Sequence, residues 1–86
     1  MGYYDSQAKV IRDARERMGL SQIEIAKHFK LTTSQLISNV ERGLCPFPTQ
    51  KARRLCEILK IQYSTTWRSA VLEDSWRRYT SKARAA

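Results

Sequence analysis

The sequence predicts a single all-α domain, and three observations support this prediction. No segment alternates apolar and polar residues with the β-branched enrichment that is typical of a strand. Apolar residues instead recur at helical spacing along nearly the whole chain. The 86 residues are enough for one hydrophobic core but not for a second. We therefore expect a compact five-helix bundle whose last helix extends beyond the core.

The first two helices are marked by their ends. The first begins at Asp5 or Ser6, either of which can cap it, and stops before Gly19, where a left-handed cap is expected. The second begins with a capping box, because the Ser21 hydroxyl can accept from a backbone N–H while Glu24 reaches back to the Ser21 N–H. The expected inward-facing residues of the two helices are Ile11, Ala14, Met18, Ile25, Ala26 and Phe29.

The third helix follows a short break at Lys30-Leu31. Residues 32–35, Thr-Thr-Ser-Gln, open it with hydroxyl caps, and it spans about 33–42 because Gly43 stops it. The side chains of Leu36, Ile37 and Val40 then point inward. Two short helices joined by so short a turn cannot lie antiparallel, so they must cross steeply, as in a helix-turn-helix.

Two further helices complete the chain. Cys45-Pro46-Phe47-Pro48 is a rigid extended linker, since each proline disfavours helix at the residue before it. A fourth helix runs from about Thr49 to Leu59, and a turn at 62–64 precedes a last helix capped by Ser64 or Thr65. Residues 77–86 are basic and are expected to fray. We divide the chain into a domain over 5–63 and a C-terminal helix with a basic tail over 64–86.

Composition excludes several classes of protein. No apolar run approaches the ~20 residues that span a bilayer, and the N-terminus lacks the features of a secretory signal. Cys45, Cys56 and His28 cannot close a structural zinc site, and no nucleophile has a His and an acid arranged around it. We expect no metal, cofactor, small-molecule ligand or catalysis. The net charge of +8 favours nucleic acid as the partner, ahead of an anionic membrane surface.

One side of the third helix is polar but almost free of charge. It holds Ser34, Gln35, Ser38, Asn39 and Arg42, with no Asp or Glu. An ordinary solvated helix face mixes Lys and Glu. Gln and Asn read adenine bidentately, Arg reads guanine, and Ser adapts to either. In a chain of charge +8, this pattern indicates a helix that meets base edges in a major groove while basic residues around it hold phosphates.

Over residues 10–61 the sequence resembles the Cro and phage-repressor type of helix-turn-helix domain, the lambda-repressor-like or XRE-like family. The matching segments are Ile11-Arg12-Asp13-Ala14-Arg15, Leu20-Ser21-Gln22-Ile23-Glu24-Ile25-Ala26, Ser38-Asn39-Val40-Glu41-Arg42-Gly43, Pro48, and Leu55-Cys56-Glu57-Ile58-Leu59-Lys60-Ile61. The resemblance implies a bundle of about five helices that is usually dimeric on DNA. It also implies a cytoplasmic bacterial or phage protein that is associated with the nucleoid.

The resemblance further implies roles for individual residues. Thr33, Ser34, Gln35, Ser38 and Asn39 match the base-facing positions. Gln22 matches a residue that touches a phosphate and braces the recognition helix, and we assign Lys30 and Arg42 to phosphates as well. Arg15 and Glu41 match an ion pair between the first and third helices, so we interpret them as structural.

The chain departs from the family pattern in the turn. It has one residue more than usual between Ala26 and Glu41, and Lys30 stands where a turn glycine is common. We expect the extra residue to change the turn, because a left-handed conformation is costly for any residue but glycine. Either Thr33 or Ser34 is then the first base-facing residue.

The last helix carries more large apolar residues than a domain of this size can bury, namely Trp67, Val71, Leu72, Trp76 and Tyr79. We expect them to form a two-fold dimer, or else to bind a different protein. The sequence therefore predicts a sequence-specific double-stranded DNA-binding transcriptional regulator, such as a repressor. The alternatives are an antitoxin-like or anti-regulator protein that binds a protein partner through the last helix, and a basic RNA-binding adaptor.

Overall fold

The computed structural model describes residues 3–85, with side chains as far as Ser81. Its helices are α1 (Asp5–Met18), α2 (Gln22–His28), α3 (Gln35–Glu41), α4 (Ala52–Leu59) and α5 (Arg68–Ala85). A short 3-10 turn, η1 (Thr49–Lys51), precedes α4, and a π-helical turn, η2 (Tyr63–Trp67), leads into α5. No strand occurs in the described range, so the predicted all-α class is confirmed.

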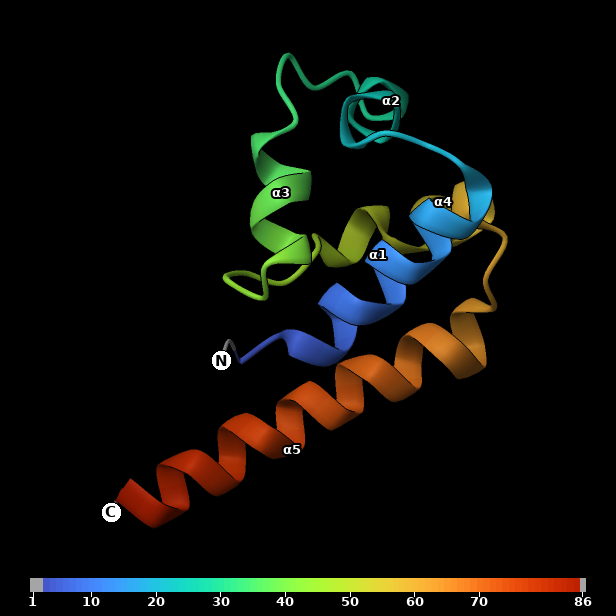
Figure 1. The fold of residues 1–86 in the computed structure, drawn as a ribbon. Coiled ribbons are helices and arrows are strands. Elements are labelled where there is room, and N and C mark those ends of the chain that lie inside the picture. The colour runs from blue at the N-terminus through green and yellow to red at the C-terminus, as the bar shows by residue number, and fades with distance from the viewer. Residues whose placement is uncertain (1–2, 86) are drawn as a thin grey trace.

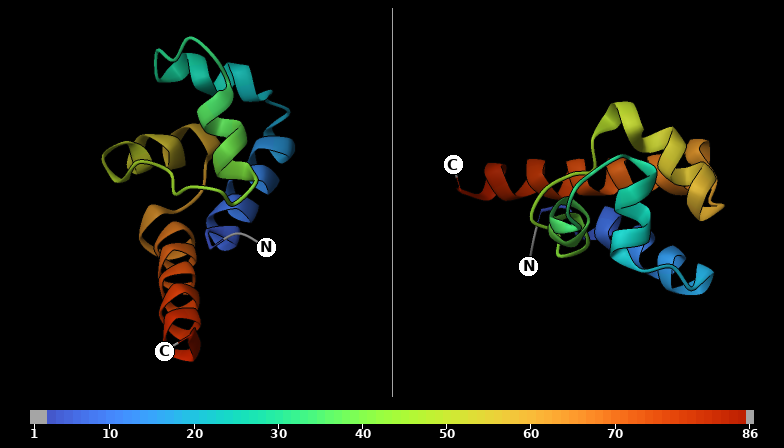
Figure 2. Two further views of the ribbon diagram at one scale, coloured as in Figure 1. Left: turned by 90° about the vertical axis from the view of Figure 1, so that its left-hand side faces the viewer. Right: turned by 90° about the horizontal axis from the view of Figure 1, so that it is seen from above.

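Helix α1 is the central element of the bundle. It contacts α3 on one side and α5 on the other, and α5 runs back along it in the antiparallel direction (Figure 1). Helices α2 and α3 cross steeply, as expected for two short helices with a short connection (Figures 1 and 2). The C-terminal half of α5 projects past the other helices (Figure 2).

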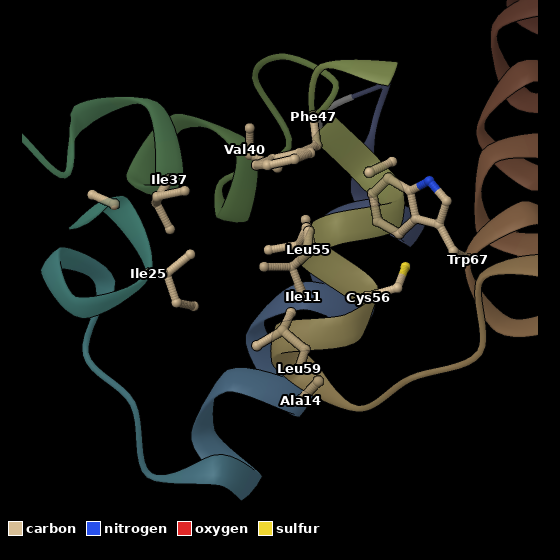
Figure 3. Close-up of a cluster of buried hydrophobic side chains, with 12 residues drawn as sticks. Ile11, Ala14, Ile25, Ile37, Val40, Phe47, Leu55, Cys56, Leu59 and Trp67 are labelled. Atoms are coloured by element: carbon tan, nitrogen blue, oxygen red, sulfur yellow. The ribbon is translucent and has the colours of Figure 1, made fainter. Parts of the chain in front are cut away.

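The core is formed by side chains from every helix. Ile11, Ile25 and Leu55 are at most 1% exposed, and the residues predicted to face inward are buried or packed against this core, except Met18, which is only half-buried. The linker over 45–48 contributes Phe47, which lies in the core with Trp67 (Figure 3). Its ring makes edge contacts with Phe29 and Trp67 at centroid distances of 5.5 and 6.4 Å. The extended linker therefore serves to place an aromatic ring in the core.

The helix ends agree with the sequence at two places and differ at a third. Gly19 adopts the left-handed conformation, with φ 70°, and both bonds of the predicted capping box form between Ser21 and Glu24. At the start of α1, however, neither Asp5 nor Ser6 is the cap. The carboxylate of Asp74, on α5, accepts from the backbone N–H of Ser6 at 2.9 Å and of Gln7 at 3.0 Å. The cap of α1 therefore comes from a distant part of the chain.

The start of α5 also differs from the prediction. The expected turn at 62–64 is instead the beginning of η2, and neither Ser64 nor Thr65 caps a helix. The N–H of Trp67 donates to the carbonyl of Gln62, at the five-residue spacing of a π-helical turn. This wider turn accompanies the burial of Trp67 in the core. At the other end, α5 continues to Ala85 rather than fraying from Arg77, and Ala86 lies outside the described residues.

Candidate nucleic-acid interface

Helix α3 is attached to α1 by a buried ion pair. Glu41 is 5% exposed, and its two carboxylate oxygens accept from Nε and Nη2 of Arg15 at 2.7 and 3.0 Å. The hydrogen bond to Glu41 raises the pKa of Arg15 above its usual value. Arg15 also donates to the carbonyl of Leu20 at 2.9 Å. The predicted Arg15–Glu41 pair is confirmed, and its two parallel bonds fix the orientation of α3 as well as its position.

Gln22 joins the same network from the start of α2. Its Nε2 donates to a carboxylate oxygen of Glu41 at 3.3 Å, and the side chain is half-buried. The expected bracing of α3 by Gln22 is therefore present. Because Glu41 binds both Arg15 and Gln22, a single carboxylate ties α1, α2 and α3 together.

The polar side of α3 lies at the surface of the protein. Gln35 is exposed, Ser38 and Asn39 are half-buried, and Ile37 and Val40 point into the core on the opposite side. Nε2 of Gln35 donates to Oδ1 of Asn39 at 2.9 Å. Among the described residues, this bond leaves the side-chain carbonyl of Gln35 as a free acceptor and the NH2 group of Asn39 as a free donor.

The connection between α2 and α3 corrects the predicted start of the third helix. Lys30 adopts the left-handed conformation, with φ 56°. Residues 32–34 form a bend, and α3 begins at Gln35 rather than at 33. Ser34 makes no side-chain cap bond, whereas the Thr33 hydroxyl accepts from the Gln35 N–H at 3.3 Å. Thr33 is exposed and Ser34 is half-buried. Both residues precede the helix that they were expected to open.

The residues assigned to phosphates lie near both ends of α3. Lys30 is exposed in the turn before it, and Arg42 is exposed directly after its last residue. Gly43, with φ 75°, then reverses the chain and ends the helix. The polar side of α3 is thus flanked in sequence by two exposed cations.

The predicted partner residues on the last helix fall into two groups. Trp67 is 3% exposed and belongs to the core, so its assignment to a partner surface was wrong; the core is larger than the sequence suggested, and Phe47 packs against the indole. Val71 is half-buried against the same core. Leu72, Trp76 and Tyr79 are each 65% exposed, and the rings of the last two stack at 5.5 Å. We call these three residues the α5 stripe.

Sequence reasoning missed the polar contacts between α1 and α5. Asp74 is completely buried, binds the first turn of α1, and forms an ion pair with Arg77, which also donates to the Ser6 hydroxyl at 3.0 Å. The sequence did contain a signal for this contact. Asp74 follows Trp67 by seven residues and Ala70 by four, so it lies on the same, otherwise apolar, side of the last helix. A carboxylate at such a position requires a buried partner.

The described residues contain no group of three or more His, Cys, Asp or Glu that could hold a metal ion. Burial raises the pKa of the Cys56 thiol to about 11, so it is protonated and unreactive at neutral pH. Cys45 is half-buried against the core and His28 is exposed. No helix in the described part of the chain is long and apolar enough to cross a membrane.

Comparison with known proteins adds nothing to this geometry. The chain matches no protein-family model, and no curated protein or solved structure shows significant similarity to it. Function must therefore be inferred from the surfaces of α3 and α5.

Proposed function

We propose that the protein is a sequence-specific double-stranded DNA-binding transcriptional regulator of the helix-turn-helix type, acting in the cytoplasm. The observation that carries this proposal is the surface of α3, where Gln35, Ser38 and Asn39 form an accessible, uncharged, hydrogen-bonding face on a chain of net charge +8. A helix face that only meets solvent does not need uncharged hydrogen-bonding side chains, whereas in a major groove such side chains meet the donors and acceptors of the base edges.

In this proposal, phosphate contacts supply most of the affinity. Lys30 and Arg42 bind phosphates before and after α3, and Gln22 adds a contact from the start of α2. Each neutralised phosphate releases counterions, so affinity should fall steeply with salt. Lys30→Gln should weaken binding to all duplexes about equally and reduce the salt slope by about one.

Base contacts from α3 select the site. The Gln35–Asn39 hydrogen bond already orients the two amides, and the free acceptor and donor that remain match the N6 amino group and N7 of adenine. Thr33, Ser34 and Ser38 are placed to contact neighbouring positions. Because the amides are ordered before binding, little side-chain entropy is lost when they meet the bases.

The α5 stripe supplies the means of pairing two copies. A two-fold contact through Leu72, Trp76 and Tyr79 would bury three large exposed apolar side chains. Two recognition helices would then read inverted half-sites ~34 Å apart, one turn of the duplex.

Selection of bound duplexes from a random pool tests the proposal. We expect a palindromic consensus containing A·T pairs. On that sequence, Gln35→Ala and Asn39→Ala should each cost about 1–3 kcal/mol of binding free energy, and little on random DNA. Gln62→Ala, an exposed amide outside α3, is the matched control. Failure to enrich any duplex, or equal losses on both kinds of DNA, would show that α3 does not read bases. Structured RNA as competitor tests the RNA-binding alternative.

The α5 stripe also favours a second candidate, an antitoxin-like or anti-regulator protein whose main role is to bind another protein. A dimer that persists in purified protein and is lost in Trp76→Ala favours the DNA-binding regulator. A monomer that recovers a stoichiometric protein partner from its host favours the second candidate.

A further inference from the structure

A groove of about 360 Å³ runs beside α5, apart from α3. It is enclosed by the start of α1, the linker and 3-10 turn over 46–49, η2, and the first half of α5. Aromatic and aliphatic side chains form most of its walls, including Tyr63, Trp67 and Leu72. Two of the residues that line it are arginines, Arg68 and Arg78, and none of the described lining residues is acidic. The groove is therefore apolar and positively charged at once.

Arg78 has hydrogen-bonding capacity that the protein does not use. Its guanidinium lies over the ring of Tyr4, 4.7 Å from the centroid, and Nη2 donates to the Ser75 hydroxyl at 3.1 Å. Nη1 is buried and has no hydrogen-bond partner among the residues that the structure describes. A buried donor of a charged group that lacks an acceptor is costly. Arg78 lines the groove, so an anionic oxygen that enters there and reaches Nη1 would supply the missing acceptor and a charge-assisted bond.

We propose that this groove is the docking site for an acidic segment of a partner protein, in which an Asp or Glu lies next to aliphatic or aromatic residues. Carboxylates of the segment would bind Arg78 and Arg68, and its apolar side chains would contact Tyr63, Val71 and Leu72. Charge complementarity decides between this occupant and a second copy of the chain. Residues 63–86 contain five Lys or Arg against two Asp or Glu, and Asp74 is already paired with Arg77. A second copy would therefore bring positive charge to a positive groove.

Occupation of the groove would affect pairing of two copies and would leave the surface of α3 uncovered. Leu72 borders the groove and also belongs to the α5 stripe, so a bound segment covers part of the surface through which two copies are proposed to associate. Helix α3 lies on the other side of α1 (Figure 1). The partner segment should consequently compete with dimer formation while leaving the α3 surface accessible.

Peptide display on the full chain tests the site. Random displayed peptides are selected on the wild-type protein, and the consensus peptide is synthesised with a fluorescein label and titrated by anisotropy. We expect a consensus that combines Asp or Glu with Leu, Ile or Phe, and binding that weakens as salt rises. Arg78→Gln and Arg68→Gln should each weaken that peptide about tenfold or more, since each removes a charge-assisted hydrogen bond. Arg17→Gln, an exposed arginine of α1 outside the groove, should change affinity by less than about twofold.

The variants separate binding from folding. Arg78 contacts Tyr4 and Ser75, so its replacement can loosen α5, whereas Arg68 is exposed and makes no tertiary hydrogen bond or ion pair with the residues that the structure describes. Thermal melts of both variants therefore accompany the titrations. The proposal is overturned if no peptide is enriched, if the consensus is neutral or basic, or if Arg68→Gln binds the peptide as tightly as wild type. It is equally overturned if no acidic peptide is selected and Arg68→Gln abolishes a dimer seen by sedimentation, because the groove would then hold a second copy. None of these outcomes changes the binding of DNA by the wild-type protein alone, so failure of the groove proposal is distinguishable from failure of the proposed function.

Discussion

Replacing Arg15 by Met removes one half of the buried pair that holds α3. The substitution deletes two bonds to Glu41 and the bond to the Leu20 carbonyl, yet keeps most of the aliphatic volume. Glu41 then remains as a carboxylate that is 5% exposed, and within the described residues the amide of Gln22 is its one remaining hydrogen-bond donor. The loss of folding free energy therefore comes more from leaving the buried Glu41 carboxylate without a cation than from the lost attraction between the two charges.

The magnitude follows from this burial. Breaking a buried pair on one side costs about 3–5 kcal/mol, and the 16% exposure of the Arg15 side chain places the expected value near the lower end, at about 3 kcal/mol. Domains of this size have a total free energy of unfolding of roughly 4–13 kcal/mol. Arg15→Met should therefore lower Tm by roughly 12–24 °C, since each kcal/mol corresponds to about 4–8 °C.

Urea unfolding followed by far-UV circular dichroism measures the effect. Arg15→Met combined with Glu41→Leu should recover all but about 1 kcal/mol of the loss, because the double variant leaves no unpaired buried charge between α1 and α3. Lys9→Met, which removes an exposed partner of Asp13, is the control and should cost less than about 1 kcal/mol. A loss below about 1 kcal/mol for Arg15→Met, or a double variant no more stable than the single one, would refute the reasoning.

Four further predictions concern other helices. Asp74→Ala removes the acceptor for two backbone N–H groups of α1 and should lower the free energy of unfolding by at least about 2 kcal/mol, whereas the exposed neighbour Glu73 should tolerate the same change. Hydrogen bonds from Ser21 lower the pKa of Glu24 below 4.5, so the ionised carboxylate stabilises the fold above pH 4.5 and this stabilisation is lost as pH falls through the folded-state pKa. The difference in urea midpoint between wild type and Glu24→Gln should therefore vanish in acid. In a Cys45→Ser variant, burial and a pKa of about 11 should protect Cys56 from a thiol reagent until urea unfolds the chain; rapid modification of the native protein would contradict this placement. Lys60 closes α4 with φ 56°, so Lys60→Gly should stabilise the protein by about 0.5–1 kcal/mol in a thermal melt, and a loss would indicate that the lysine side chain contributes more than the strain costs.

Local signals predicted the helices well because they act over a few residues. The capping box at Ser21–Glu24 and the stop at Gly19 depend only on their immediate neighbours, and both form as expected. Apolar spacing likewise identified the inward faces of α3 and α4. The Arg15–Glu41 pair, 26 residues apart, became predictable only through the resemblance to a known family.

The predictions that failed depend on tertiary contacts. Nothing near residue 5 shows that its helix is capped by Asp74, because the two segments meet only after folding. Trp67 was placed at the surface because apolar residues were counted against an assumed core size, and the spacing of α5 does not show how Phe47 reaches it. The start of α3 was mispredicted because the hydroxyl residues over 32–34 are typical of a helix start, and their sequence does not show at which residue the helical hydrogen bonds begin.

The fastening of α1 at both of its ends has a consequence for native-state dynamics. Its first turn is bound by Asp74 of α5, and its last turn carries Arg15, which is bound to Glu41 of α3. Neither neighbouring helix can detach without uncovering part of α1, so the amides around Ile11 should exchange with deuterium only when the whole molecule opens. Helices α1, α3 and α5, which are remote in sequence, would then open as one cooperative unit. The bend over 32–34 would open independently of that unit.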